Sequence, residues 1–202
     1  MKLKLGVLAS GRGSNLQAII DACKKNEIQA EVAIIISDVP GAQALERAKK
    51  AGLKTTILER KKYSTKNEYE TALINELKQA QVDLVCLAGY MRIVGKTFLA
   101  AFPNRVINIH PALLPSFPGL DAQKQAWEYG VKVSGCTVHF VDDLTDHGPI
   151  ILQTMVPVQD DDTVETLSER ILKEEHKLYS KAIQLIAENK LDIKGRKVRI
   201  KF

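Results

Sequence analysis

The stretch Leu3-Lys-Leu-Gly-Val-Leu-Ala-Ser-Gly-Arg-Gly-Ser-Asn-Leu-Gln-Ala-Ile-Ile-Asp-Ala-Cys-Lys-Lys25 decides the fold class. Residues 3–9 form an apolar run that predicts a buried strand, and residues 16–25 have the apolar spacing of a helix. The loop between them, residues 10–15, contains two glycines. A buried strand, a glycine loop and a helix in this order predict the first unit of a parallel α/β sheet.

The alternation of strands and helices continues along the chain. Apolar runs predict strands at residues 32–37, 55–58, 84–88 and 106–109, and helical spacing occurs at residues 43–51 and 66–79. A helix near residues 123–129, two strands at 136–141 and 150–158, and an amphipathic helix at 164–189 follow. The pattern predicts an α/β, Rossmann-like fold with a central, mostly parallel sheet and helices on both faces. Since no linker or repeat interrupts it, we expect residues 1–202 to form a single domain.

Composition places the chain among ordinary globular proteins. It has 202 residues, of which 45% are hydrophobic and 26% are charged. No apolar run approaches about 18 residues, so a transmembrane span is not expected. The apolar part of the N-terminus is too short for a signal peptide, and we expect a cytoplasmic protein. Cys23, Cys86 and Cys136 form no Cys-x-x-Cys pair, so we expect reduced cysteines in the core.

The net charge of +5 is concentrated at the C-terminus. Residues 190–202 carry six basic side chains and one acid. Residues 197–202 alternate between charged and apolar, which is typical of a half-buried edge strand. A basic tail is also compatible with an arm that binds nucleic acid.

The loop at residues 10–15 is a candidate anion site. Backbone N–H groups and the helix dipole favour an anion at such a position. Leu16 stands where a dinucleotide fingerprint needs its third glycine, and the Lys-Ser/Thr of a P-loop is missing. Two interpretations of the loop remain. It binds a single phosphate, such as that of a sugar phosphate, or it is a tight turn without a ligand. Asp38, in Asp38-Val-Pro-Gly41, is interpreted as a turn residue.

A second candidate site combines Asn108 and His110 with a carboxylate. Asn108 and His110 are two residues apart, so they lie on one face at the end of a strand. An amide there can donate to an oxyanion, and a histidine can carry a proton. A carboxylate from residues 142–146 would orient the imidazole and raise its pKa. The alternatives are a hydrogen-bonded core histidine and a metal site that uses His110, His139 and His147. We expect no metal, because His139 lies between apolar strand residues and no His-x-x-x-His pair exists.

These motifs together resemble the phosphoribosylglycinamide formyltransferases of purine biosynthesis, a family of folate-dependent enzymes. The resemblance runs from residue 4 to about residue 190. It rests on the glycine loop, on Leu-Ala-Gly89-Tyr-Met-Arg-Ile, on Asn108-Ile-His110-Pro-Ala-Leu-Leu-Pro, and on the stretch from Gly135 to Ile150 with its Thr-Asp146-x-Gly-Pro. It implies transfer of a formyl group from 10-formyltetrahydrofolate to the amine of glycinamide ribonucleotide. Folate would be a co-substrate, with no tightly bound cofactor and no metal.

The resemblance also implies site residues. The catalytic residues are Asn108, His110 and Asp146. The ribonucleotide is expected to contact Gly13, Ser14, Asn15, Gly89, Pro111 and Glu175. The folate is expected to contact Lys66, Met91, Arg92, Ile93, Val94 and Asn108, together with Asp142, Asp143, Leu144, Thr145 and Asp146.

Lys66 stands where the family often has an arginine near the acidic folate tail. A lysine keeps the charge but not the bidentate geometry, so this position departs from the family. Small-molecule partners and a monomer or homodimer are expected, without nucleic acid or membrane. Two alternatives stay open: a methionyl-tRNA formyltransferase or formyltetrahydrofolate hydrolase, and a nucleic-acid-binding protein that uses the basic tail.

Overall fold

The computed structural model describes residues 1–201, which form two compact units divided after Ile107. The elements in chain order are β1 (Leu3–Leu8), α1 (Ser14–Lys24), β2 (Ala30–Ser37), α2 (Gln43–Lys50), β3 (Thr55–Ile57), a 3-10 turn (Arg60–Lys62), α3 (Lys66–Gln79), β4 (Leu84–Leu87), α4 (Lys96–Ala101), β5 (Val106–His110), α5 (Ala122–Tyr129), β6 (Val133–Phe140), β7 (Ile150–Pro157), α6 (Val164–Ala187), β8 (Leu191–Lys194) and β9 (Lys197–Ile200). The boundary between the units falls within β5, and the single domain expected for residues 1–202 stays a prediction.

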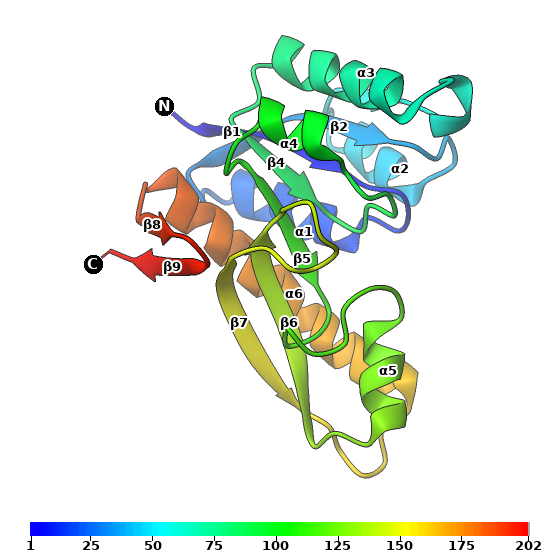
Figure 1. Cartoon of the computed structure of the whole chain (residues 1–202), viewed down its shortest axis with the longest axis vertical. Coiled ribbons are helices and arrows are strands. Elements are labelled where there is room, and N and C mark those ends of the chain that lie inside the picture. The colour runs from blue at the N-terminus through cyan, green and yellow to red at the C-terminus, as the bar shows by residue number, and fades with distance from the viewer. Residues whose placement is uncertain (202) are drawn as a thin grey trace. The chain divides into compact units, whose positions relative to one another are not determined.

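The first unit is built on a parallel sheet. Its strands follow the order β3-β2-β1-β4, and each of these neighbouring pairs is parallel. The side chains of Leu5, Val7 and Ile34 have no exposed surface, as is typical of a sheet covered on both faces. Helix α1 contacts α2, and α3 contacts α4. Figure 1 shows these two pairs on opposite sides of the sheet, and the predicted α/β class with helices on both faces is confirmed.

The connections of the first unit create a ligand-binding position. Strand β1 has β2 on one side and β4 on the other, so the chain reverses the direction of sheet growth there. Open α/β sheets bind ligands outside the carboxyl ends of the strands at such a point. The glycine loop follows β1 and the segment from Ala88 follows β4. The Ser10 amide donates to the Gly89 carbonyl at 3.1 Å, so the two segments are in contact.

The second unit combines a long hairpin with a long helix. Strands β6 and β7 are antiparallel, and α6 packs against both of them while α5 packs against α6 (Figure 1). Thr163 and Thr166 form a capping box at the start of α6. The buried Thr137 hydroxyl donates to the Ala112 carbonyl at 2.7 Å, which ties the segment after β5 to β6.

The C-terminal residues form a hairpin. Strand β9 pairs with β7 through Ile150 and Lys197, and β8 pairs with β9 on its other side. The predicted alternation is present, since Val198 and Ile200 are half-buried between exposed charged residues. The prediction of an edge strand is wrong in one respect, because β8 lies outside β9 and occupies the edge. Neither β8 nor α4 was predicted, since four to six residues carry too little periodicity to be recognised. Phe202, the last residue of the predicted strand, lies outside the described residues.

The cysteines behave largely as expected. Cys86 and Cys136 are buried, Cys23 is half-buried, and all three are free thiols. Burial raises the pKa of the Cys136 thiol to about 12, which keeps it protonated and unreactive. Within residues 1–201, no helix has both the length and the apolar character needed to cross a membrane.

Candidate active site

The end of β5 places Asn108 and His110 beside a carboxylate from a distant loop. His110 is 4% exposed, and its Nδ1 lies 3.3 Å from Oδ2 of Asp146. Asn108 Nδ2 lies 3.4 Å from Oδ1 of the same carboxylate. The structure therefore brings together the three side chains expected to be catalytic, and all three belong to the second unit.

Asp146 lies where several N–H groups converge. Its Oδ2 accepts a hydrogen bond of 2.8 Å from the Gly119 amide, and its Oδ1 lies 3.7 Å from Nε2 of His139. Burial alone would raise the pKa of Asp146, but His139, the Gly119 amide and His110 together lower it below its ordinary value. The carboxylate is therefore charged at neutral pH and fixed from several directions.

The environment of His110 differs from the sequence-based expectation. Nε2 lies 2.8 Å from the Phe117 carbonyl, which only accepts, so Nε2 carries a proton. Burial lowers the pKa of His110 below its ordinary value, while Asp146 and the Phe117 carbonyl act in the opposite direction without outweighing it. The predicted influence of the carboxylate is thus present, but the expected net rise is wrong because desolvation is larger. A proton that reaches Nδ1 is held by Asp146.

His139 also belongs to this cluster. The sequence analysis placed it between apolar strand residues and gave it no role. It is 2% exposed on β6, and its Nδ1 lies 2.8 Å from the Phe140 carbonyl. Nδ1 therefore carries a proton, and Nε2 lies 3.3 Å from Asn108 Nδ2. This contact orients the Asn108 amide. A histidine inside an otherwise apolar strand, Val138-His139-Phe140, was the available signal.

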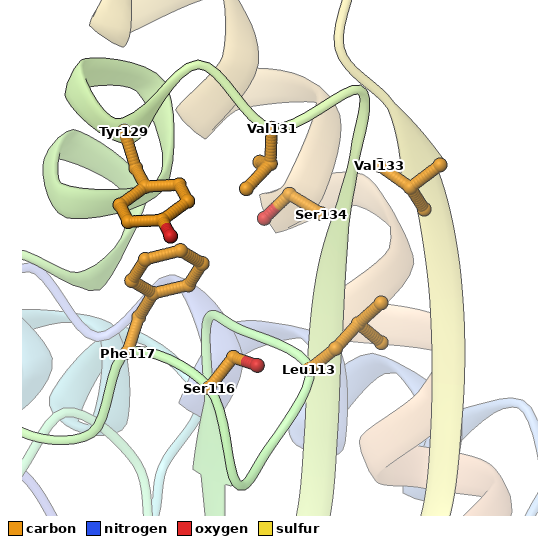
Figure 2. A pocket seen from close by; sticks show the side chains of 7 residues that line it. All are labelled: Leu113, Ser116, Phe117, Tyr129, Val131, Val133 and Ser134. Atoms are coloured by element: carbon orange, nitrogen blue, oxygen red, sulfur yellow. The ribbon is translucent and has the colours of Figure 1, made fainter.

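A pocket of about 400 Å³ is lined in part by Phe117, whose carbonyl contacts His110. Figure 2 shows the side chains that line it: Leu113, Ser116, Phe117, Tyr129, Val131, Val133 and Ser134. The Phe117 ring faces Tyr129, with centroids 5.9 Å apart, while the Phe117 carbonyl contacts His110. None of the residues predicted to bind substrate lines this pocket.

The glycine loop of the first unit ends at a helix N-terminus without a side-chain cap. Gly13 has φ +68°, and Ser14 begins α1. A Cβ on Gly13 would lie 2.7 Å from both Cα and Cβ of Ala44, so glycine is required here by packing against α2. Asn15 is 8% exposed. The uncapped amides at this terminus suit an anion such as a phosphate.

The segment after β4 is held by contacts with Ser10 and with buried Asp38. Ser10 Oγ accepts from the Met91 amide at 2.9 Å and donates to Asp38 Oδ1 at 2.6 Å. Arg92 Nε forms an ion pair with Asp38 Oδ2 at 2.5 Å. Asp38, interpreted from the sequence as a turn residue, therefore anchors the segment that contains the expected folate contacts.

The side chains of that segment differ in exposure. Met91 and Ile93 are each 65% exposed, whereas Val94 is buried and leaves only its backbone for a ligand. The Gly95 amide donates to Oε1 of buried Glu70 at 2.6 Å. Lys66 Nζ lies 3.7 Å from the same oxygen, so the residue expected near the folate tail is paired within α3.

The remaining predicted residues lie in the second unit. Asp142, Asp143, Leu144 and Thr145 occupy the loop between β6 and β7, and the side chain of Leu144 is 56% exposed. Pro111 follows the end of β5, and Glu175 is 6% exposed on α6. Throughout residues 1–201, no group of three or more His, Cys, Asp or Glu side chains is arranged to hold a metal ion.

The chain is similar in sequence to known formyltransferases. The family model described as "Formyl transferase" matches residues 3–183. The chain is 46% identical over 187 residues to phosphoribosylglycinamide formyltransferase of Bacillus subtilis (strain 168), covering 92% of this chain and 96% of the relative. It is 43% identical to the trifunctional purine biosynthetic protein adenosine-3 of Gallus gallus, covering 95% of this chain but only 19% of that protein. This chain thus spans about a fifth of the trifunctional relative.

A solved structure is also similar to this chain over its whole length. Glycinamide ribonucleotide transformylase 1 from Symbiobacterium toebii superposes with a TM-score of 0.98 at 54% identity, covering 100% of this chain and 95% of the other. A family model over most of the chain, a full-length relative and a solved structure agree. The chain belongs to the formyl transferase family.

Proposed function

We propose that the chain transfers the formyl group of 10-formyltetrahydrofolate to the amine of glycinamide ribonucleotide, a step of purine biosynthesis. The observation that carries the proposal is the cluster of Asn108, His110 and Asp146 at the end of β5. The names of the relatives that align over nearly their full length support the formylation of glycinamide ribonucleotide.

The cluster has the groups that acyl transfer to an amine requires. The amine nitrogen forms a bond with the formyl carbon, and the carbonyl oxygen becomes an oxyanion that the Asn108 amide stabilises. The bond between the formyl carbon and the folate nitrogen then breaks. The proton lost by the amine passes to the departing folate nitrogen through His110, whose imidazolium form is stabilised by Asp146. The formyl carbon keeps its oxidation state, so the reaction needs no redox cofactor.

The first unit offers groups suited to parts of both substrates. The N-terminus of α1 at Gly13, Ser14 and Asn15, where the helix dipole favours an anion, suits the ribonucleotide phosphate. The exposed side chains of Met91 and Ile93 offer an apolar surface to the folate ring. The remaining proposed contacts are those that the family resemblance implies: Gly89, Pro111 and Glu175 for the ribonucleotide; Lys66, Arg92, Val94, Asn108 and residues 142–146 for the folate. Cytoplasmic location and a monomer or homodimer also stay predictions.

The decisive assay supplies the purified protein with 10-formyltetrahydrofolate in three arms. The first arm adds glycinamide ribonucleotide, the second adds methionyl-tRNA, and the third adds no acceptor. We expect tetrahydrofolate release only in the first arm, with the formylated ribonucleotide identified by mass spectrometry. Formate release without an acceptor would indicate a hydrolase, and formylated methionyl-tRNA would indicate the other relative.

A further inference from the structure

The C-terminal hairpin contacts the loop that contains Asp146. Arg196 lies in the turn between β8 and β9, and its Nη2 donates to the His147 carbonyl at 2.7 Å. Its Nη1 lies 3.0 Å from Nε2 and 3.1 Å from Nδ1 of the His147 ring. The guanidinium therefore contacts both the backbone and the ring of the residue that follows Asp146.

The partners of His147 determine how the ring is protonated. Asp142 Oδ2 lies 2.8 Å from Nδ1, and a carboxylate only accepts, so Nδ1 carries the proton. Arg196 Nη1 is nearly equidistant from the two ring nitrogens, so it lies over the face of the imidazole ring. Arg196 thus packs on the His147 ring and donates to the His147 carbonyl, while His147 donates to Asp142.

These contacts cross a loop that contains a residue in the left-handed conformation. Asp146 has φ +49°, a left-handed conformation that non-glycine residues adopt at an energetic cost. At one end of the loop, Asp142 Oδ1 accepts from the Leu144 amide at 3.1 Å. At the other end, a Cβ on Gly148 would lie 1.8 Å from the Phe140 carbonyl, so the backbone is packed tightly there. Between these ends, His147 is fixed by Arg196.

The sheet explains why Arg196 reaches this loop. Lys197, the next residue, pairs with Ile150, which is close to the end of the loop. The guanidinium is thereby held next to His147, although the two residues are 49 positions apart in the chain.

We propose that Arg196 is a positioning residue, which through His147 holds residues 142–146 so that Asp146 faces His110 and the loop is shaped for the folate. This inference rests on the proposed function. It assigns a role to one residue of the basic C-terminus. Small displacements of catalytic groups reduce rates by about 10–100-fold, and this is the effect expected here.

The test compares Arg196→Ala with Arg199→Ala. Arg199 is exposed on β9 of the same hairpin, so the control removes the same charge without touching the loop. We expect Arg196→Ala to lower kcat about 10–100-fold and to raise the KM for 10-formyltetrahydrofolate. The KM for glycinamide ribonucleotide and the activity of Arg199→Ala should both stay within about twofold of wild type. Arg196→Lys keeps the charge but not the forked donors, so its kcat should be intermediate.

Two measurements that do not need activity separate positioning from folding. The ¹⁵N shifts of His147 should report the Nδ1–H tautomer in wild type and in Arg199→Ala, and a mixture of tautomers in Arg196→Ala. Hydrogen exchange of the Gly119 amide, which donates to Asp146, should accelerate only in Arg196→Ala. Because exposed ionic contacts contribute little stability, the Tm of Arg196→Ala should fall by less than about 4 °C.

The failures of the two proposals are distinguishable. A wild-type protein that does not formylate glycinamide ribonucleotide contradicts the proposed function, while the exchange and ¹⁵N data still test the contact with the loop. An active wild type with Arg196→Ala indistinguishable from Arg199→Ala in kinetics, exchange and ¹⁵N shifts overturns the role of Arg196.

Discussion

Replacing Asp146 by asparagine removes one charge from the centre of the cluster and changes almost nothing in its shape. The carboxylate accepts from Gly119 through Oδ2 and faces the Asn108 amide through Oδ1. Asparagine has a single acceptor oxygen. Its NH₂ group must therefore face either the Gly119 amide or the Asn108 amide, and one of these donors loses its acceptor.

The substitution should also change the pKa of His110, on which burial and Asp146 have opposite effects. Burial lowers the pKa of His110, and Asp146 at 3.3 Å opposes this fall. An opposite charge at this distance favours the imidazolium form. Asp146→Asn should therefore lower the pKa of His110 further. The reduced imidazolium stability should decrease kcat by about 10²–10⁴.

The sign of the pH effect does not depend on which form of His110 is active. Activity that needs the imidazolium is lost as pH rises through the pKa, and activity that needs the neutral ring is gained there. In both cases the inflection follows the pKa, so it moves to lower pH in Asp146→Asn.

The assay is the pH dependence of kcat from about pH 5 to about pH 9, where a histidine titrates, together with an NMR titration of the His110 ring. Asp160→Asn is the matched control, because Asp160 is 93% exposed and pairs with Lys132 away from the cluster. Equal inflections and equal ring titrations in wild type and Asp146→Asn would refute the electrostatic coupling. The formyltransferase proposal would then remain, without Asp146 as a catalytic residue.

Three further changes test other parts of the site. Asn108→Ala should lower kcat by about 10²–10³, or about 3–4 kcal/mol, with the ribonucleotide Kd nearly unchanged; turnover close to wild type would contradict the oxyanion role. Gly13→Ala should lower the free energy of unfolding in urea by about 2–4 kcal/mol, because of the positive φ and the contact with α2. Gly41→Ala, which meets nothing within 4 Å, should change that energy by less than about 0.5 kcal/mol, and equal stabilities would show that the loop adapts. Ser14→Asp places a negative charge at the start of α1 and should raise the ribonucleotide KM at least about tenfold, whereas Ser64→Asp on an exposed loop should not; an unchanged KM would argue against a phosphate at this terminus.

Much of the site was accessible from the sequence because its signals are local. Asn108 and His110 are two residues apart on one strand, and the glycine loop directly joins β1 to α1. Such groups lie close together in any fold that forms those elements. The carboxylate was less accessible. Residue chemistry alone allowed any acid of the loop at 142–146, and the family resemblance selected Asp146.

The sequence by itself determined the fold class, the parallel first unit and the long C-terminal helix, because alternating apolar runs dictate which faces must be buried. Only the tertiary structure decided how segments far apart in the chain combine. Asp146 reaches Asn108 across 38 residues, and Arg196 reaches His147 across 49. The direction of the His110 pKa shift also depends on the structure, since desolvation depends on every segment that covers the ring. The periodicity of apolar residues can be recognised within a short segment. The burial of a side chain, and its contacts with residues far away in the chain, depend on how distant strands pair.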